Sequence, residues 1–226
     1  MSLNLIPPND FAASEETATE YLHSVLDGAV ANGRHASTAR RPQAAVGMLA
    51  SPALGPLLGP LMVAVSAQGI VLIHFLHQEP DFANALGRLR RRFDPVIDHK
   101  AVAIVGQELR RFMSGDETAL RSKPDLSLVN GAFQRKVLDR LLQVGRGSTV
   151  TYSWLAAAVK APGAARAVGT AMHDNPIPIY VPCHRVVRSD LSLGGYGGGL
   201  ELKRRLLELE GIAFDAKGRL ARASGE

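Results

Sequence analysis

A histidine directly follows the only cysteine of the 226-residue chain, in the stretch Ile177-Pro178-Ile179-Tyr180-Val181-Pro182-Cys183-His184-Arg185-Val186-Val187. A single thiol cannot form an internal disulfide, so Cys183 is either a small buried apolar side chain or a nucleophile. Pro178 and Pro182 each remove a backbone donor and fix φ, so we expect Cys183 at the end of a stiff, strand-like segment. A thiol reacts as its thiolate, which is scarce at neutral pH. His184 and Arg185 are candidates to increase the thiolate fraction.

Length and composition indicate a globular protein. A hydrophobic content of 46% in 226 residues is enough for one large or two small domains. No apolar run approaches the roughly 18 to 20 residues that cross a bilayer, and the amino terminus lacks the basic start of a signal peptide. We therefore expect no membrane partner and a reducing, cytoplasmic location, associated with the nucleoid in a bacterium. The net charge of +5 favours a polyanionic partner, although many basic proteins bind none.

Residues 1–43 are predicted to be an extension. Thr17-Ala18-Thr19-Glu20 has the form of a helix capping box, and an amphipathic helix is expected after it, with its apolar face made of Tyr21, Leu22, Val25, Leu26, Ala29 and Val30. The basic segment 33–42 reads as a linker that is either solvated or in contact with phosphate.

Residues 44–123 are predicted to form an α/β domain. Its elements follow in the order strands 44–50, 61–66 and 70–75, then helices 82–93 and 102–113. Ala67-Gln68-Gly69 is expected to join the last two strands as a hairpin, and an apolar loop is expected at 54–61. Ser114-Gly115-Asp116 ends the last helix, and the polar stretch that follows is the expected domain boundary. His74 and His77 have no nearby cysteine and no third ligand in pattern, so we expect no metal.

Residues 124–226 are predicted to be mainly helical, with a helix-turn-helix. Helices are expected at 133–142, from a cap at Thr151 or Ser153 to 159, and at 164–173, with Pro162-Gly163 as the turn. The third helix has few long side chains besides Arg166 and His173, so it could approach a nucleic-acid groove or simply pack its alanines against a neighbour. A closing helix follows, with Leu202, Leu206 and Leu209 inward and Lys203, Arg204 and Arg205 on other faces.

The segment from Gly194 to Gly199 around Tyr196 is a glycine-rich loop. It lacks the Gly-Lys-Ser/Thr ending of a P-loop, so we expect it to pass over a flat ligand and not to bind phosphate.

Several motifs occur in order between about residues 133 and 211 and carry a resemblance to a known family: Thr151-Tyr152, Ala164-Ala165-Arg166-Ala167-Val168-Gly169, Asn175-Pro176-Ile177-Pro178, Pro182-Cys183-His184-Arg185-Val186-Val187 and Gly194-Gly195-Tyr196-Gly197-Gly198-Gly199-Leu200. Together they resemble the O6-alkylguanine-DNA alkyltransferases. The resemblance implies a ribonuclease-H-like α/β domain followed by a winged-helix-like helix-turn-helix domain. It also implies a methylated-DNA–protein-cysteine S-methyltransferase that repairs double-stranded DNA as a monomer, without a cofactor. O6-alkylguanine is the expected substrate and O4-alkylthymine a further candidate, with irreversible transfer to Cys183 once per molecule.

The resemblance also implies roles for single residues. Cys183 would be the nucleophile, and His184, through a water, and Glu210 would withdraw its proton. Tyr152 and Lys203 would donate to the leaving guanine, Asn175 would brace the turn before Cys183, and Arg166 would fill the space of the flipped base. The other implied DNA contacts are Thr151, Tyr152, Ala164, Ala165 and Arg185. The implied pocket residues are Pro178, Val181, Tyr196, Gly197 and Gly198.

Two other functions are compatible with parts of the sequence. A non-enzymatic alkylated-DNA lesion sensor or helix-turn-helix regulator would bind DNA, but lesion sensors of this kind lack the acceptor cysteine. A Cys-His hydrolase is disfavoured because adjacent side chains in an extended segment point apart and no oxyanion motif is visible.

Overall fold

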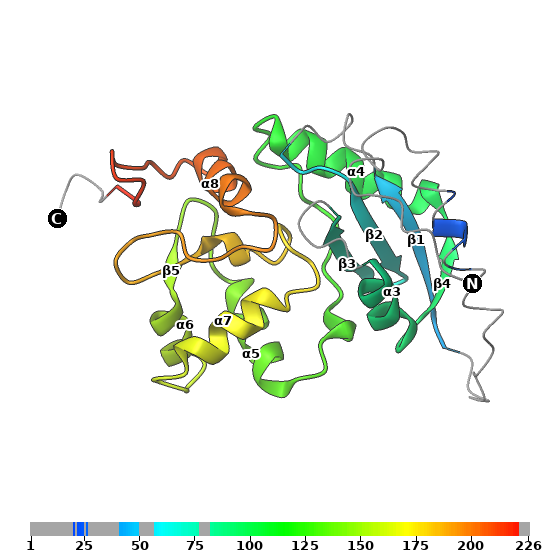
Figure 1. Cartoon of the computed structure of the whole chain (residues 1–226), viewed down its shortest axis with the longest axis horizontal. Helices are drawn as coiled ribbons and strands as arrows, with labels where there is room; N and C mark the ends of the chain where they lie inside the picture. The colour runs from blue at the N-terminus through cyan, green and yellow to red at the C-terminus, as the bar shows by residue number, and fades with distance from the viewer. Residues whose placement is uncertain are drawn as a thin grey trace. The chain divides into compact units, whose positions relative to one another are not determined.

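The computed structural model describes residues 41–49, 57–76 and 82–221, together with Glu20, 22–24 and Leu26. The chain divides into two compact units, Met1–Leu128 and Val129–Glu226 (Figure 1). Most of the predicted extension at 1–43 and part of the predicted apolar loop at 54–61 lie outside the described residues. No helix in the described part of the chain is long and apolar enough to span a membrane.

The first unit is built on a four-stranded sheet with the order β3-β2-β1-β4. The strands are β1 (Gln43–Leu49), β2 (Leu61–Ser66), β3 (Gly69–Phe75) and β4 (Asp94–Ile97). β2 is antiparallel to both β1 and β3, as the predicted hairpin requires, whereas β4 runs parallel to β1. The sequence did not predict β4, because aspartate and proline are depleted in strands. Pro95 is tolerated there because β4 lies at the edge of the sheet.

Helices α3 (Phe82–Arg90) and α4 (His99–Met113) cover opposite faces of this sheet. Successive residues of β1 point to opposite faces of the sheet. Val46 and Met48 belong to the core beneath α3, whereas a Cβ on Gly47 would lie 2.4 Å from Val102 of α4. α4 begins three residues before its predicted start because the side chain of Asp98 accepts hydrogen bonds from two amides of its first turn.

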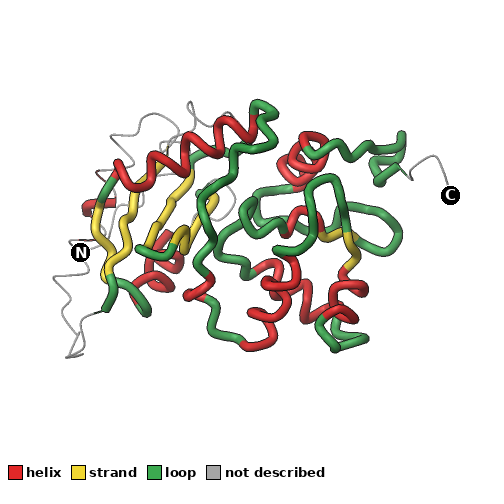
Figure 2. The backbone as a smooth tube through the Cα atoms, turned by 180° about the vertical axis from the view of Figure 1, so that it is seen from behind, coloured by secondary structure: helices red, strands yellow, loops and turns green. Residues whose placement is uncertain are grey.

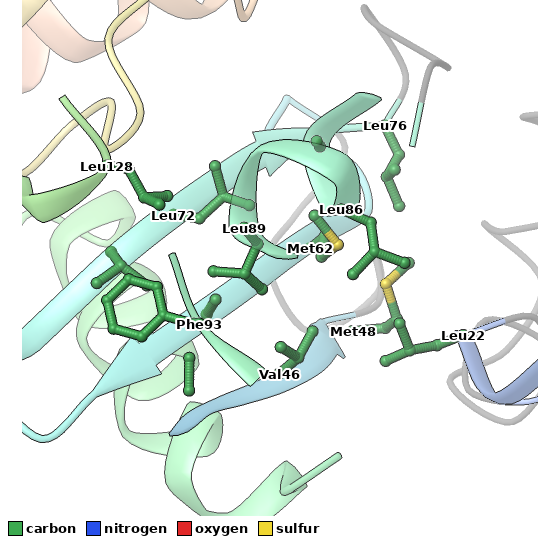
Figure 3. Packing of buried hydrophobic residues seen from close by; sticks show 14 residues of the cluster. Leu22, Val46, Met48, Met62, Leu72, Leu76, Leu86, Leu89, Phe93 and Leu128 are labelled. Carbon is green, nitrogen blue, oxygen red and sulfur yellow. The ribbon is translucent and has the colours of Figure 1, made fainter. Parts of the chain in front are cut away.

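The core between the sheet and α3 is apolar throughout (Figure 3). Leu86, Leu89 and Phe93 from the α3 side are at most 3% exposed and meet strand residues such as Met62 and Leu72. Each such side chain stabilises the fold by about 1.5–3 kcal/mol through burial. The core therefore supplies the stability on which the first unit depends.

The second unit consists of short helices joined by loops (Figure 2). Its helices are α5 (Ala132–Leu141), α6 (Tyr152–Ala158), α7 (Ala165–His173) and α8 (Leu200–Leu209). Each lies within a few residues of its predicted range, and Gly163, with φ of +88°, makes the turn between α6 and α7. Two short parallel strands, β5 (Val150–Thr151) and β6 (Val186–Val187), tie the start of α6 to the segment after the cysteine.

The predicted strand-like segment before Cys183 is wrong. Residues 177–181 form a tight turn, closed by the Val181 amide donating to the Ile177 carbonyl at 2.9 Å, and Cys183–Arg185 is a single 3-10 turn, η3. The only strand here, β6, comes after the cysteine. Pro178 and Pro182 remove two donors that a sheet would need, so the segment closes on itself instead.

Candidate active site

Cys183 is buried at the start of η3, with 6% of its surface exposed. Its Sγ accepts a hydrogen bond from Nδ2 of Asn175 at 3.1 Å. Burial raises the pKa of the thiol, and the Asn175 hydrogen bond opposes this rise. The thiol is therefore neutral at rest and needs a base at the moment of reaction.

Asn175 holds the whole turn around the thiol. Besides the contact with sulfur, its Nδ2 donates to the Val181 carbonyl at 2.9 Å and its Oδ1 accepts from the Ile177 amide at 3.1 Å. Ile179, inside this turn, has φ of +76°, which costs a β-branched residue about 1–3 kcal/mol. The Asn175 hydrogen bonds and the burial of Ile179 offset this strain, so the brace expected of Asn175 is present in the geometry.

His184 and Glu210 form a buried pair. His184 Nε2 lies 3.0 Å from Oε1 of Glu210, and both side chains are fully buried. Burial alone would raise the pKa of Glu210, but the hydrogen bonds from His184 and Arg185 outweigh it and lower the pKa to about 2. Burial lowers the pKa of His184 despite the carboxylate. The imidazole is thus neutral, with the Nε2 proton on the carboxylate side and a lone pair on Nδ1.

The Nδ1 atom of His184 is buried and has no hydrogen-bond partner within the described residues. Buried polar atoms are normally paired, so this lone pair is a site for an incoming proton. The sequence-based argument that Cys183 and His184 point apart is wrong, because both belong to one 3-10 turn and not to an extended strand.

Arg185 is not placed as the sequence predicts. The resemblance implies a DNA contact for Arg185, but its side chain is only 14% exposed. Its guanidinium donates two hydrogen bonds to Glu210, from Nε to Oε2 at 2.9 Å and from Nη2 to Oε1 at 2.7 Å. It also donates to the Val144 carbonyl. This bidentate pairing fixes the carboxylate that faces His184.

Lys203 also differs from its prediction, because it is fully buried and not on an outer face of α8. Its ammonium donates to the carbonyls of Val186, Leu193 and Gly195. Burial lowers its pKa to about 8, and a thiolate at Cys183 would act in the opposite direction. Since an ammonium has three N–H groups and all three have carbonyl partners, the geometry favours anchoring of the glycine-rich loop over donation to a substrate.

Tyr152 and Tyr196 contribute to the surroundings of the cysteine. Tyr152 is the half-buried first residue of α6, and burial raises its pKa, so its hydroxyl remains a donor. Its Oη lies 3.0 Å from where a Cβ on Gly194 would be, which only glycine permits. The ring of Tyr196 meets the His184 ring edge-on, with centroids 6.4 Å apart. In the same glycine-rich loop, Gly197 is exposed and Gly198 is buried.

Helices α6 and α7 carry the other predicted contacts. Of the two predicted caps, Thr151 is the one that caps α6, by accepting from the Trp154 amide at 3.0 Å. α7 buries Val168, Ala171 and Met172 and leaves Arg166 exposed. Ala164 and Ala165 are half-buried at its amino end, and Pro178 and Val181 are buried in the turn braced by Asn175. Within the described part of the chain, no three His, Cys, Asp or Glu side chains are grouped as a metal site would require.

The sequence did not predict the pairing of Arg185 with Glu210 or of Lys203 with three carbonyls. The partners are separated by 25 residues in the first case and by up to 17 in the second, so no local spacing signals them.

Comparison with known proteins identifies the family. The model of the 6-O-methylguanine DNA methyltransferase DNA-binding domain matches residues 132–212. A methylated-DNA–protein-cysteine methyltransferase of Mycobacterium tuberculosis H37Rv is 38% identical over 155 residues, which are 68% of this chain and 87% of the relative. The chain belongs to the methylated-DNA–protein-cysteine methyltransferase family. A relative from Methanothermobacter thermautotrophicus is 43% identical over 113 residues, 48% of this chain and 61% of its own length.

Solved structures of the family agree with this fold. The O6-methylguanine methyltransferase of M. tuberculosis matches with a TM-score of 0.56 and 35% identity over 80% of this chain and 97% of its own. A complex of the M. tuberculosis protein OGT with DNA matches with a TM-score of 0.57 and 34% identity over 74% and 92%. The predicted fold class, an α/β unit followed by a mainly helical DNA-binding unit, is therefore confirmed.

Proposed function

We propose that this methyltransferase repairs O6-alkylguanine in double-stranded DNA by moving the alkyl group to Sγ of its own Cys183. The observation that carries the proposal is the arrangement at η3, where a thiol held by Asn175 shares one turn with a neutral histidine paired to Glu210. The repair activity is that of the family, and binding of DNA is consistent with a relative solved in complex with it.

The base must leave the helix before it can react. The alkyl carbon of a stacked guanine is inaccessible, and extruding the nucleotide costs a few kcal/mol. α7 presents the exposed Arg166 next to small residues, a combination suited to filling the gap that the base leaves. Thr151, Ala164 and Ala165 would lie along the same minor-groove surface.

The transfer itself is an in-line displacement at the alkyl carbon. A sulfur lone pair of Cys183 forms the new S–C bond while the bond from carbon to guanine O6 breaks. The thiol proton goes to Nδ1 of His184, directly or through a water, and Glu210 stabilises the resulting imidazolium. The departing guanine takes up one proton, which we assign to the hydroxyl of Tyr152, and the proton taken by His184 then restores that hydroxyl, so that overall one proton passes from the thiol to guanine.

The product is a thioether, and water does not regenerate a thiol from it under mild conditions. Each molecule therefore acts once. Pro178, Val181 and the Tyr196 loop would border the alkyl group and set the size it can have.

Substitution of Cys183 tests the proposal. Cys183→Ser should abolish transfer from an O6-methylguanine duplex while DNA affinity stays within a few-fold, because phosphate contacts supply most of the binding. Ser189→Ala, a change at an exposed serine, is the control and should leave the rate unaltered. Transfer that persists in the Cys183→Ser protein would disprove the proposal.

A further inference from the structure

Arg188 is placed beside Tyr152 by the small sheet of the second unit. β5 and β6 are parallel, with Val150 opposite Val186 and Thr151 opposite Val187. Tyr152 and Arg188 are the next residues of the two strands, so both leave the sheet at the same end. Two residues that are 36 positions apart in sequence thus become neighbours at the entrance of α6.

Their side chains meet over Gly194. The position of a Cβ on Gly194 lies 3.0 Å from Oη of Tyr152 and 3.5 Å from Cγ of Arg188. Burial raises the pKa of Tyr152, and the positive charge of Arg188 acts against that rise. The same charge adds to the effect of burial in lowering the pKa of Lys203. The charges of Cys183 and Arg188 therefore both act on Tyr152 and Lys203, and Arg188 is the exposed residue among these four.

The backbone of Arg188 is held by hydrogen bonds, whereas its side chain is exposed to solvent. Its amide donates to the Ser192 carbonyl at 2.9 Å, and its carbonyl accepts from the Leu191 amide at 3.0 Å. Its side chain is exposed, and its guanidinium has no hydrogen-bond or ion-pair partner in the described parts of the chain. The nearby carboxylate of Asp190 instead accepts from the amide and hydroxyl of Ser192.

Other arginines of this unit are already engaged with carboxylates or an amide, in the pairs Arg135–Asp139, Arg140–Gln143, Arg185–Glu210 and Arg204–Glu208. Within the residues that the structure describes, the Arg188 guanidinium makes no hydrogen bond or ion pair, although its charge, with that of Arg219, helps to lower the pKa of Asp190. Such a group at the rim of a site suits an anionic ligand from outside.

We propose that Arg188 binds the backbone phosphate next to the extruded nucleotide. This inference rests on the proposed function. When a base enters beside Tyr152, its phosphates stay at the protein surface, where the side chain of Arg188 is exposed next to Gly194. The planar fork of arginine matches the oxygens of a phosphate in a bidentate geometry that lysine cannot reproduce. Arg188 would thus hold the flipped nucleotide in place while Cys183 reacts.

Transfer rates on two substrates test this role. Arg188→Ala should slow transfer from an O6-methylguanine duplex on the order of tenfold, the effect of losing one charge-assisted hydrogen bond. The same variant should react normally with free O6-benzylguanine, which has no phosphate. Arg188→Lys should recover part of the duplex rate, and Arg205→Ala, which removes an exposed charge from α8, should match wild type. Equal slowing on both substrates would mean that Arg188 supports the pocket, and the inference would fall.

Neutralising single phosphates makes the test specific. In a duplex whose phosphate beside the lesion is replaced by a methylphosphonate, wild type should slow to the rate of Arg188→Ala, and the variant should lose nothing further. If Arg188→Ala stayed slower than wild type by the same factor whichever linkage is neutralised, the inference would be overturned. Failure of the proposed function is a separate result, because wild-type protein would then leave Cys183 unmodified with either substrate.

Discussion

One amide side chain, that of Asn175, holds both the reactive sulfur and the strained turn before it. Its Nδ2 donates to Sγ of Cys183 and to the Val181 carbonyl, and its Oδ1 receives the Ile177 amide. A donor to sulfur favours the thiolate, so this contact works against the effect of burial on the thiol. Asn175 therefore links the shape of the turn to the reactivity of the nucleophile.

Asn175→Asp should slow the reaction of Cys183 while keeping the size of the side chain. The carboxylate removes the N–H donor and places a negative charge beside the forming thiolate, which should raise the pKa of Cys183. A hydrogen bond to a charged group contributes about 1.5–3 kcal/mol, so the rate at neutral pH should fall at least roughly tenfold. The measurement is the pH dependence of Cys183 alkylation by iodoacetamide. Asn130→Asp, at an exposed asparagine, is the control. An unchanged profile in Asn175→Asp would exclude this role.

Lys203 makes the free energy of unfolding depend on pH, and comparison with a variant that lacks this lysine measures its contribution. Burial lowers its pKa to about 8, whereas a lysine in an unfolded chain titrates near ~10.4. Between these values the unfolded chain binds a proton that the folded protein has released, so this group's contribution to stability increases as pH rises. Below pH 8 both states are protonated and the contribution is constant.

The prediction is a comparison of wild type with Lys203→Met. The free energy of unfolding of wild type, relative to the variant, should increase by about 1 kcal/mol between pH 7 and pH 9. Denaturant titrations at the two pH values measure it, with Lys217→Met as the control at an exposed lysine. A difference that does not change with pH would show that Lys203 does not titrate there.

Single residues divide into those that sequence could place and those that it could not. Cys183, His184 and Thr151 were recognisable because their neighbours in sequence are part of the signal. The burial of Lys203 and the pairing of Arg185 with Glu210 could not be predicted, because the hydrogen-bond partners of both residues come from other segments of the chain. Both residues are charged, and charged side chains are normally expected at the surface.

At the scale of elements, local signals predicted the helices well. The Thr151 cap and the Pro162-Gly163 turn fixed α6 and α7 to within a few residues. β4, β5 and β6 were missed because two- to four-residue strands have no periodicity to detect, and their existence depends on a distant partner. The apolar run at 177–182 predicts a strand but forms a turn, because Pro178 and Pro182 have no amide proton to donate to a neighbouring strand.

Helix α7 carries the prediction for Arg166. An inserted side chain stabilises the gap left by a flipped base, a benefit that does not exist for free O6-benzylguanine. Arg166→Ala should therefore slow repair of a duplex much more than reaction with the free base. The defect should shrink when the lesion lies opposite a mismatch that makes flipping easier. Rates on the three substrates measure this, and equal slowing on all of them would assign Arg166 to the fold or the pocket.

At the scale of the whole molecule, the two units were predictable for different reasons. The β-like segments around the Ala67-Gln68-Gly69 hairpin and the helical spacing of Phe82, Leu86, Leu89 and Phe93 predicted most elements of the first unit, and the resemblance predicted its α/β architecture. The collinear motifs between about residues 133 and 211 predicted the second through its resemblance to a family. The network that connects Cys183, Asn175, His184, Glu210 and Arg185 required the folded structure.

The most direct test of the central claim is a count of alkyl groups. Wild-type protein is incubated with a large excess of O6-methylguanine duplex, and repaired guanine and protein mass are followed together. Repair should stop at one guanine per protein molecule, with one methyl group on the peptide that contains Cys183. Continued repair beyond one equivalent, or a methyl group on any other residue, would contradict transfer to this cysteine.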